Sequence, residues 1–177
     1  MLTRIKRKTV AAGAGRFAIV ASQYNPRYVQ AMVNAARAEL KRAGVKAVEV
    51  VRVPGAYEIP LVASRLARTH TQHATRGMLN ATGLSAIICL GVIIRGETAH
   101  AAHIGEAVSR ALMDIQLRHE IPVVHEVLLL ENEAQARARC LGRTHNRGAE
   151  AAQTALRMAE VMRRVSGNPL QSACPPA

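Results

Sequence analysis

Aromatic residues are scarce in this sequence and tryptophan is absent, which removes one common way of binding nucleic acid. Aromatic residues make up 2% of the 177 positions, too few to stack a run of unpaired bases. Acidic residues are also few: 12 Asp and Glu stand against 24 Lys and Arg, giving a net charge of +12. This charge is dispersed, and no helix-turn-helix, zinc-finger or RNP pattern accompanies it. We therefore expect a surface that attracts anions, without a specific nucleic-acid partner.

Cysteines and long apolar runs are few as well. The three cysteines, Cys89, Cys140 and Cys174, are widely spaced and form no CxxC pair, which argues against a disulfide framework and a zinc site. Cys89 lies in an apolar run and is expected to be a small core residue. No segment has the ~18 to 20 apolar residues of a membrane helix, and the basic N-terminus lacks the apolar stretch of a secretory signal. The expectation is a soluble, cytoplasmic protein.

Short apolar runs alternate with segments of helical periodicity along most of the chain. The apolar runs predict strands over 16–22, 45–53, 84–94 and 121–130. The helical periodicity predicts helices over 26–44, 57–70, from residue 100 onward, 131–140 and 146–165. Such alternation is typical of an α/β fold, a parallel sheet with helices on both faces, and the most apolar run, 84–94, is expected at its centre.

A single domain is expected over residues 16–165. Residues 1–15 are basic and then rich in Gly and Ala, which indicates a flexible arm, and residues 166–177 form a tail. Residues 71–83 are polar and fit neither the strand nor the helix pattern.

Polar and aromatic residues gather where the predicted strands end. Tyr24 and Asn25 follow the first strand, residues 54–58 the second, and residues 96–100 the third, while the basic segment 137–147 lies beyond the fourth. In a parallel sheet ligands bind outside the carboxyl ends of the strands, so these loops form the candidate site. Asn25 can also cap the helix that follows it.

The segment Gly96-Glu97-Thr98 is expected to open a helix. The free N–H groups and the positive dipole end of such a helix suit a phosphate or another anion. Alternatively, Thr98 serves only as the helix cap. Neither GxGxxG nor the Walker lysine motif is present, so the segment is no dinucleotide fingerprint.

His100 follows this segment and has three possible roles. An unperturbed imidazole titrates near ~6.5 and can exchange protons at neutral pH. His100 can equally be a structural residue bonded to a neighbouring loop. A metal site shared with His103 fits their i, i+3 spacing, but no carboxylate or cysteine partner is evident.

Arg139 stands between Arg137 and Arg143 in a basic helical segment. A guanidinium can clamp a phosphate with two hydrogen bonds. It can also belong to a solvated basic face, and spacing alone does not separate the two roles.

Five motifs occur in the order seen in lumazine synthases: VASQYNP, VPGAYEIP, LGVIIRGETAH, QARAR and NRGAEAA. The chain resembles that family over residues 16–165. The resemblance implies a flavodoxin-like three-layer sandwich with a central four-stranded parallel sheet. It also implies condensation of 5-amino-6-ribitylaminouracil with 3,4-dihydroxy-2-butanone 4-phosphate to 6,7-dimethyl-8-ribityllumazine, with release of phosphate and water. No metal or organic cofactor is implied.

The resemblance assigns the proton transfer and the phosphate to particular residues. His100 matches the family's proton-transfer histidine. Glu97 and Thr98 match the turn that holds the butanone phosphate, and Arg139 matches the arginine that clamps it. Glu150 is a candidate for orienting the histidine.

The pyrimidine and the ribityl chain are assigned by the same resemblance, with several departures. The matched residues are Tyr24, Asn25, Ala56, Tyr57, Glu58, Val92, Ile93, Ile94 and His125. Tyr24 and Tyr57 replace the more usual phenylalanines and keep an aromatic face. His125 replaces a phenylalanine at the substrate ring, Glu126 stands where glycine is common, and Arg147 replaces a lysine.

The resemblance further implies a site shared between subunits. Tyr24 and His100 of one chain would face His125 and Arg139 of the next, so a pentameric ring is the minimum functional unit. The short connector 140–145 matches family members whose pentamers close into an icosahedral shell.

Two alternatives remain beside the enzyme. One is a related flavin-pathway binder on the same scaffold. The other is a capsid-forming protein that has lost activity and packs anionic cargo. The presence of His100 and Arg139 favours the enzyme, whereas assembly without turnover would favour the shell.

Overall fold

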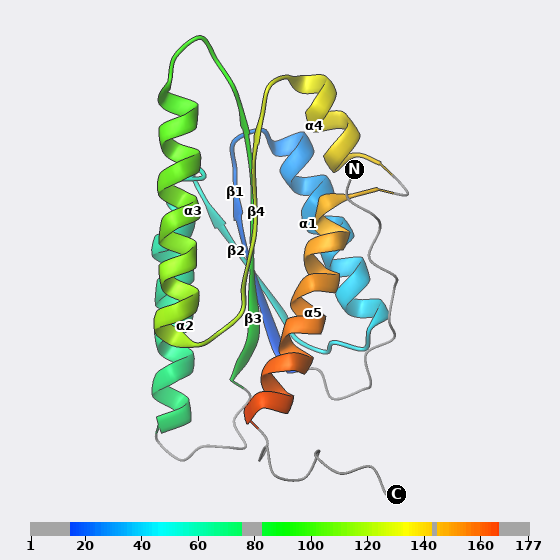
Figure 1. The fold of residues 1–177 in the computed structure, drawn as a ribbon. Helices are drawn as coiled ribbons and strands as arrows, with labels where there is room; N and C mark the ends of the chain where they lie inside the picture. Colours follow the sequence, from blue (N-terminus) through cyan, green and yellow to red (C-terminus); the bar gives the residue numbers. More distant parts are fainter. Residues whose placement is uncertain (1–14, 76–82, 143–144, 167–177) are drawn as a thin grey trace, which may run out of the picture.

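The computed structural model describes residues 15–75, 83–142 and 145–166, which form three layers (Figure 1). The elements in chain order are β1 (Arg16–Ser22), α1 (Pro26–Arg42), β2 (Val48–Val53), α2 (Ile59–Thr75), β3 (Leu84–Ile94), α3 (His100–His119), β4 (Val123–Leu130), α4 (Glu133–Cys140) and α5 (Arg147–Ser166). The expected arm at 1–15 and tail at 166–177 fall almost entirely outside the described residues. Among the described helices, none combines the length and apolar composition of a membrane span.

The four strands form one parallel sheet in the order β2-β1-β3-β4. β3 pairs with β1 on one side and β4 on the other, as its apolar sequence predicted. After β1 the chain places β2 on one side and β3 on the other, so the order reverses between β1 and β3. This flavodoxin-like arrangement leaves a crevice for ligands beyond the carboxyl ends of those two strands.

Helices cover both faces of the sheet, as the alternating pattern predicted. Figure 1 shows α2 and α3 on one face and α1, α4 and α5 on the other. Successive residues of a strand point to opposite faces. In β3, Ile88 therefore packs in the core beneath α1 and α5, while Cys89 is buried in the core beneath α2 and α3. The prediction that Cys89 is a core residue is confirmed.

The predicted strands were accurate at β1 and β3 and began too early at β2 and β4. β2 begins at Val48 because Gly44, at φ 83°, turns the chain after α1 and the Val45 N–H bonds back to the Leu40 carbonyl at 3.1 Å. This turn confirms Gly44 as the end of the α1 region. β4 begins at Val123, directly after Pro122, which has no N–H to donate to a sheet.

The predicted helices were correct in place, with different bounds. α2 runs to Thr75, five residues beyond the predicted end at residue 70, so 71–75 are helical and residues 76–82 lie outside the described part. α4 begins at Glu133 rather than Glu131, because the side chain of Asn132 caps it by accepting from the Gln135 N–H.

Two predicted side-chain caps were wrong. Asn25 occupies the cap position of α1, but it is left-handed, with φ 54°, and its side chain makes no capping bond. α3 begins at His100 with Ala99 as its cap residue, so neither Gly96-Glu97-Thr98 nor the Thr98 hydroxyl opens that helix. Both corrections concern loops of the candidate site, where side chains have other uses.

Candidate active site

A cavity of about 680 Å³ lies beyond the carboxyl ends of β1, β2 and β3, against the first turns of α3. It is therefore at the reversal of strand order, where parallel sheets bind ligands. Its walls are formed by Tyr24, Asn25, Gly55, Ala56, Tyr57, Glu58, Val92, Ile93, Ile94, His100, His103, Ile104 and Ala107. Three separate predicted loops thus meet at one cavity.

Asn25 positions the first of these loops. Its Nδ2 donates to the Val92 carbonyl of β3 at 2.9 Å, which ties the end of β1 to the end of the central strand. A residue with φ 54° is uncommon outside glycine, and asparagine tolerates it better than most. The resulting bend places Tyr24 at the cavity with 72% of its surface exposed. An exposed aromatic ring beside a cavity is a platform for another flat ring.

The loop after β2 forms the second wall. Gly55 lies against the Tyr24 ring, because a Cβ added to Gly55 would be 3.3 Å from Cδ2 of Tyr24. The Gly55 N–H donates to Oε2 of Glu58 at 2.8 Å, so Glu58 closes its own turn. Ala56 is buried, whereas Tyr57 is 63% exposed. The loop thus presents a second aromatic ring and a carboxylate to the cavity.

The end of β3 and the start of α3 complete the cavity. Val92 is buried and Ile93 and Ile94 are half-buried, so they form an apolar floor. His100 is exposed at the first position of α3 and lines the cavity. Glu97 and Thr98 are also exposed, in the bend between the floor and the histidine, but their side chains do not line the cavity.

Three lining residues on α3 were not predicted to bind substrate, and one of them, His103, was a candidate from the sequence only as a metal ligand. His103, Ile104 and Ala107 stand three, four and seven residues after His100, on the same helix face. That spacing was sufficient to find them once His100 was placed at a cavity. Within 15–75, 83–142 and 145–166, no group of three or more His, Cys, Asp or Glu residues is arranged to hold a metal ion.

A second set of predicted residues lies apart from this cavity. His125 is an exposed residue of β4, and its Nε2 is 2.9 Å from the Ser109 Oγ of α3. Loss of hydration lowers the pKa of His125 below its ordinary value. Arg139 is exposed on α4, which covers the opposite face of the sheet. One chain therefore does not bring the predicted phosphate clamp to the predicted histidine.

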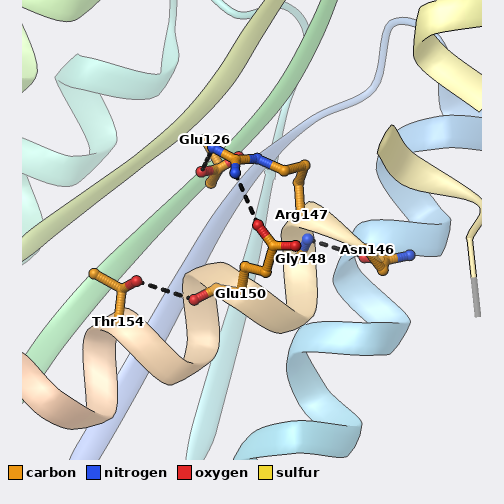
Figure 2. A network of polar contacts seen from close by, with 6 residues as sticks. All are labelled: Glu126, Asn146, Arg147, Gly148, Glu150 and Thr154. Carbon is orange, nitrogen blue, oxygen red and sulfur yellow. Dashed lines mark hydrogen bonds and ion pairs between the residues drawn. The ribbon is translucent and has the colours of Figure 1, made fainter. Parts of the chain in front are cut away.

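Near Arg139, three charged residues form the network drawn in Figure 2. Arg147 donates through Nε and Nη2 to the two oxygens of Glu126, at 2.9 and 2.7 Å, and through Nη1 to Glu150 at 2.8 Å. Burial raises the pKa of Glu126 to about 7, against the opposing charges of Arg147 and Arg139. Glu150 is thus held by Arg147 in this chain. Its expected role of orienting a histidine stays a prediction.

Comparison with known proteins identifies relatives over most of the chain. The family model for 6,7-dimethyl-8-ribityllumazine synthase matches residues 14–163. A 6,7-dimethyl-8-ribityllumazine synthase of Xanthomonas campestris pv. campestris (strain B100) is 41% identical over 149 residues, covering 83% of this chain and 89% of its own length. The enzyme of that name from Stenotrophomonas maltophilia (strain R551-3) is 39% identical over 154 residues, covering 86% and 92%.

Proposed function

The chain belongs to the 6,7-dimethyl-8-ribityllumazine synthase family, and we propose that it condenses 5-amino-6-ribitylaminouracil with 3,4-dihydroxy-2-butanone 4-phosphate. The observation that carries this proposal is the cavity at the reversal of strand order, which holds two aromatic rings, an apolar floor and an exposed histidine. These groups suit a flat pyrimidine and a reaction that depends on proton transfer.

The pyrimidine is proposed to bind against Tyr24. A ring that is exposed and supported from behind by Gly55 can stack on a heterocycle without first leaving a packed position. Ile93 and Ile94 would contact its edge from below. Glu58 can keep its bond to the Gly55 N–H with one oxygen and accept from a ribityl hydroxyl with the other.

His100 is proposed to carry the protons of the reaction. The amine of the pyrimidine substrate attacks the butanone carbonyl, water leaves to give an imine, and phosphate is eliminated. The second nitrogen then attacks the remaining carbonyl, and loss of a second water closes the ring. Each of these steps moves a proton to or from nitrogen, carbon or oxygen. An exposed imidazole at the cavity wall can accept and return those protons.

The phosphate is proposed to bind Arg139 of an adjacent chain. Arg139 is exposed and forms no ion pair with another residue of the described segments, so it can offer its whole guanidinium to a phosphate. The Glu97–Thr98 bend would contact the same phosphate from the other side, in the chain that supplies His100.

Arg139→Ala should raise the KM for the butanone phosphate by roughly 10-fold or more, since a charge-assisted bidentate contact is lost. The KM for the pyrimidine should change much less. Steady-state kinetics with each substrate varied in turn measures both. Arg137→Ala is the matched control, because Arg137 is on the same helix but pairs with Glu133 at 3.1 Å. Equal KM values in the two variants would show that Arg139 is a solvated surface residue that does not bind the phosphate.

The division of the site between two faces of the sheet supports an assembly in which one chain completes the site of another. By the family resemblance we propose a pentameric ring, and the short connector 140–145 suggests that twelve such rings close into a shell. The isolated chain leaves Leu61, Met113 and Leu117 more than half exposed, which is typical of surfaces that other subunits cover. Light scattering on the purified protein should give at least five times the mass of one chain. A monomeric mass would contradict the shared site, and a pentameric mass would contradict only the shell.

Formation of 6,7-dimethyl-8-ribityllumazine from the two substrates, followed by its absorbance, tests the proposed reaction directly. Turnover above the uncatalysed rate supports the enzyme. An assembled particle without turnover supports the shell protein. Tight binding of the lumazine without its formation supports a binder in the flavin pathway.

A further inference from the structure

We propose that Glu126 is a positioning residue for the anion-binding half of the site: it holds the guanidinium of Arg147 and so leaves the phosphate to Arg139, which has no ion pair among the described residues. The inference rests on the proposed function for the identity of the natural anion. The pairing on which it depends is a property of this chain alone.

The contacts of Arg147 with Glu126 and Glu150 occupy most of its hydrogen-bond donors. A guanidinium has five N–H groups in a fixed plane. Three of them are used, two by Glu126 and one by Glu150. The side-on geometry, with Nε and Nη2 on one carboxylate, is the arrangement that a phosphate would otherwise take. Glu126 therefore occupies the face of Arg147 that an anion would need.

Burial makes this contact hard to exchange. Glu126 is 7% exposed and points to the face of β4 that packs beneath α5, as Val124 and Leu128 do. If Arg147 moved to an anion, the Glu126 carboxylate would lose its partner in a place with little water. A buried carboxylate without its cation is strongly unfavourable unless it takes up a proton. The pair thus restrains Arg147 more than a surface pair would.

Arg139 lies within reach of the same charges and remains outside the pair. Burial and the nearby charge of Glu126 raise the pKa of Cys140 to about 11, against the opposing charges of Arg139 and Arg147. The charge of Arg139 also acts on Glu126, so Arg139 lies in the same electrostatic environment as the pair. Arg139 is nevertheless exposed, so its guanidinium is open to an incoming anion.

The start of α5 fixes this arrangement. Asn146 donates from Nδ2 to the Cys140 carbonyl and accepts from the Gly148 N–H at 2.9 Å. The backbone that carries Arg139 is thereby joined to the backbone that carries Arg147. Because the backbone positions are fixed in this way, Glu126 has only to hold the Arg147 side chain. Arg147 then stays in the ion pair, and Arg139 remains available for the phosphate.

The test is whether Arg147 takes over when Glu126 loses its charge. Binding of inorganic phosphate is measured by calorimetry on the assembled protein, with and without Arg139→Gln, in the wild-type and Glu126→Gln backgrounds. We expect Arg139→Gln to weaken phosphate binding by roughly 10-fold or more in the wild type. In the Glu126→Gln background, Arg139→Gln should weaken phosphate binding by less than about threefold, because the released Arg147 then binds the anion.

Glu160→Gln is the matched control, since it removes the same charge from another Glu–Arg pair of α5, on the surface and paired with Arg164. In the Glu160→Gln background, Arg139→Gln should weaken phosphate binding by the same factor as in the wild type. Equal costs in the wild-type and Glu126→Gln backgrounds would overturn the inference, as would an unchanged affinity on replacing Arg139 alone. Lumazine formation by the wild type, measured in the same preparation, decides the proposed function separately.

Discussion

His100→Ala should slow lumazine formation by roughly 100-fold while the fold and the assembly stay intact. Proton transfer by a positioned imidazole contributes on the order of 10² to 10⁴ in rate, and we expect the lower end of that range. His100 is exposed at the first position of α3, so its removal leaves no buried void. The loss should therefore be in kcat and not in stability.

The measurement is the initial rate of lumazine formation with the uncatalysed rate subtracted, since any spontaneous condensation would hide part of the loss. His103→Ala is the informative comparison, because His103 lines the same cavity one turn later on the same helix. If His100 carries the protons, His103→Ala changes kcat by at most a few-fold. If His103→Ala abolished activity and His100→Ala kept it, His103 and not His100 would be the residue that transfers the protons.

The four strands and the central position of β3 could be predicted from the sequence because a parallel sheet covered on both faces needs continuous apolar runs. β1 and β3 had the predicted bounds for this reason. The starts of β2 and β4 could not be placed, because apolar residues such as Val45 and Ile121 continue into the core before the strand pairing begins. Burial and hydrogen-bonded pairing are different properties, and an apolar pattern reports only the first.

The cavity loops could be predicted as a group, since each follows a strand of the same sheet edge. The contacts that the side chains of these loops make could not be predicted. Asn25 satisfies the usual preference for a helix cap, yet its side chain bonds to Val92, 67 positions away. The α3 residues that join His100 at the cavity could be found from their helical spacing only after His100 was placed at the cavity wall.

The Glu126–Arg147 pair was beyond sequence analysis for a related reason. The two residues are 21 positions apart, on a strand and a helix that meet only through the packing of α5 on the sheet. In the sequence they were two unrelated departures from the family pattern. The structure makes them partners, and it also explains why Glu150 pairs with Arg147, three residues away on the same helix face.

Gly148→Ala should destabilise the chain by about 3 kcal/mol or more. Gly148 is buried in the first turn of α5, where that helix crosses α1. A Cβ at this position would lie 2.5 Å from the carbonyl carbon of Met32, 2.6 Å from its Cα and closer still to its carbonyl oxygen. All three are backbone atoms of α1, which cannot rotate away as a side chain can. The two helices would have to separate, and the core that they share would lose contact.

Gly105→Ala gives the opposite expectation and serves as the control. Gly105 is also helical, but a Cβ there would lie 3.6 Å from Cδ2 of Leu129 and 3.8 Å from its Cβ, which is ordinary contact. Since alanine favours a helix over glycine by up to about 1 kcal/mol, Gly105→Ala should be neutral or slightly stabilising. Urea and thermal unfolding at matched protein concentration compare the two variants with the wild type. A Gly148→Ala protein as stable as Gly105→Ala would contradict the close packing of α5 on α1.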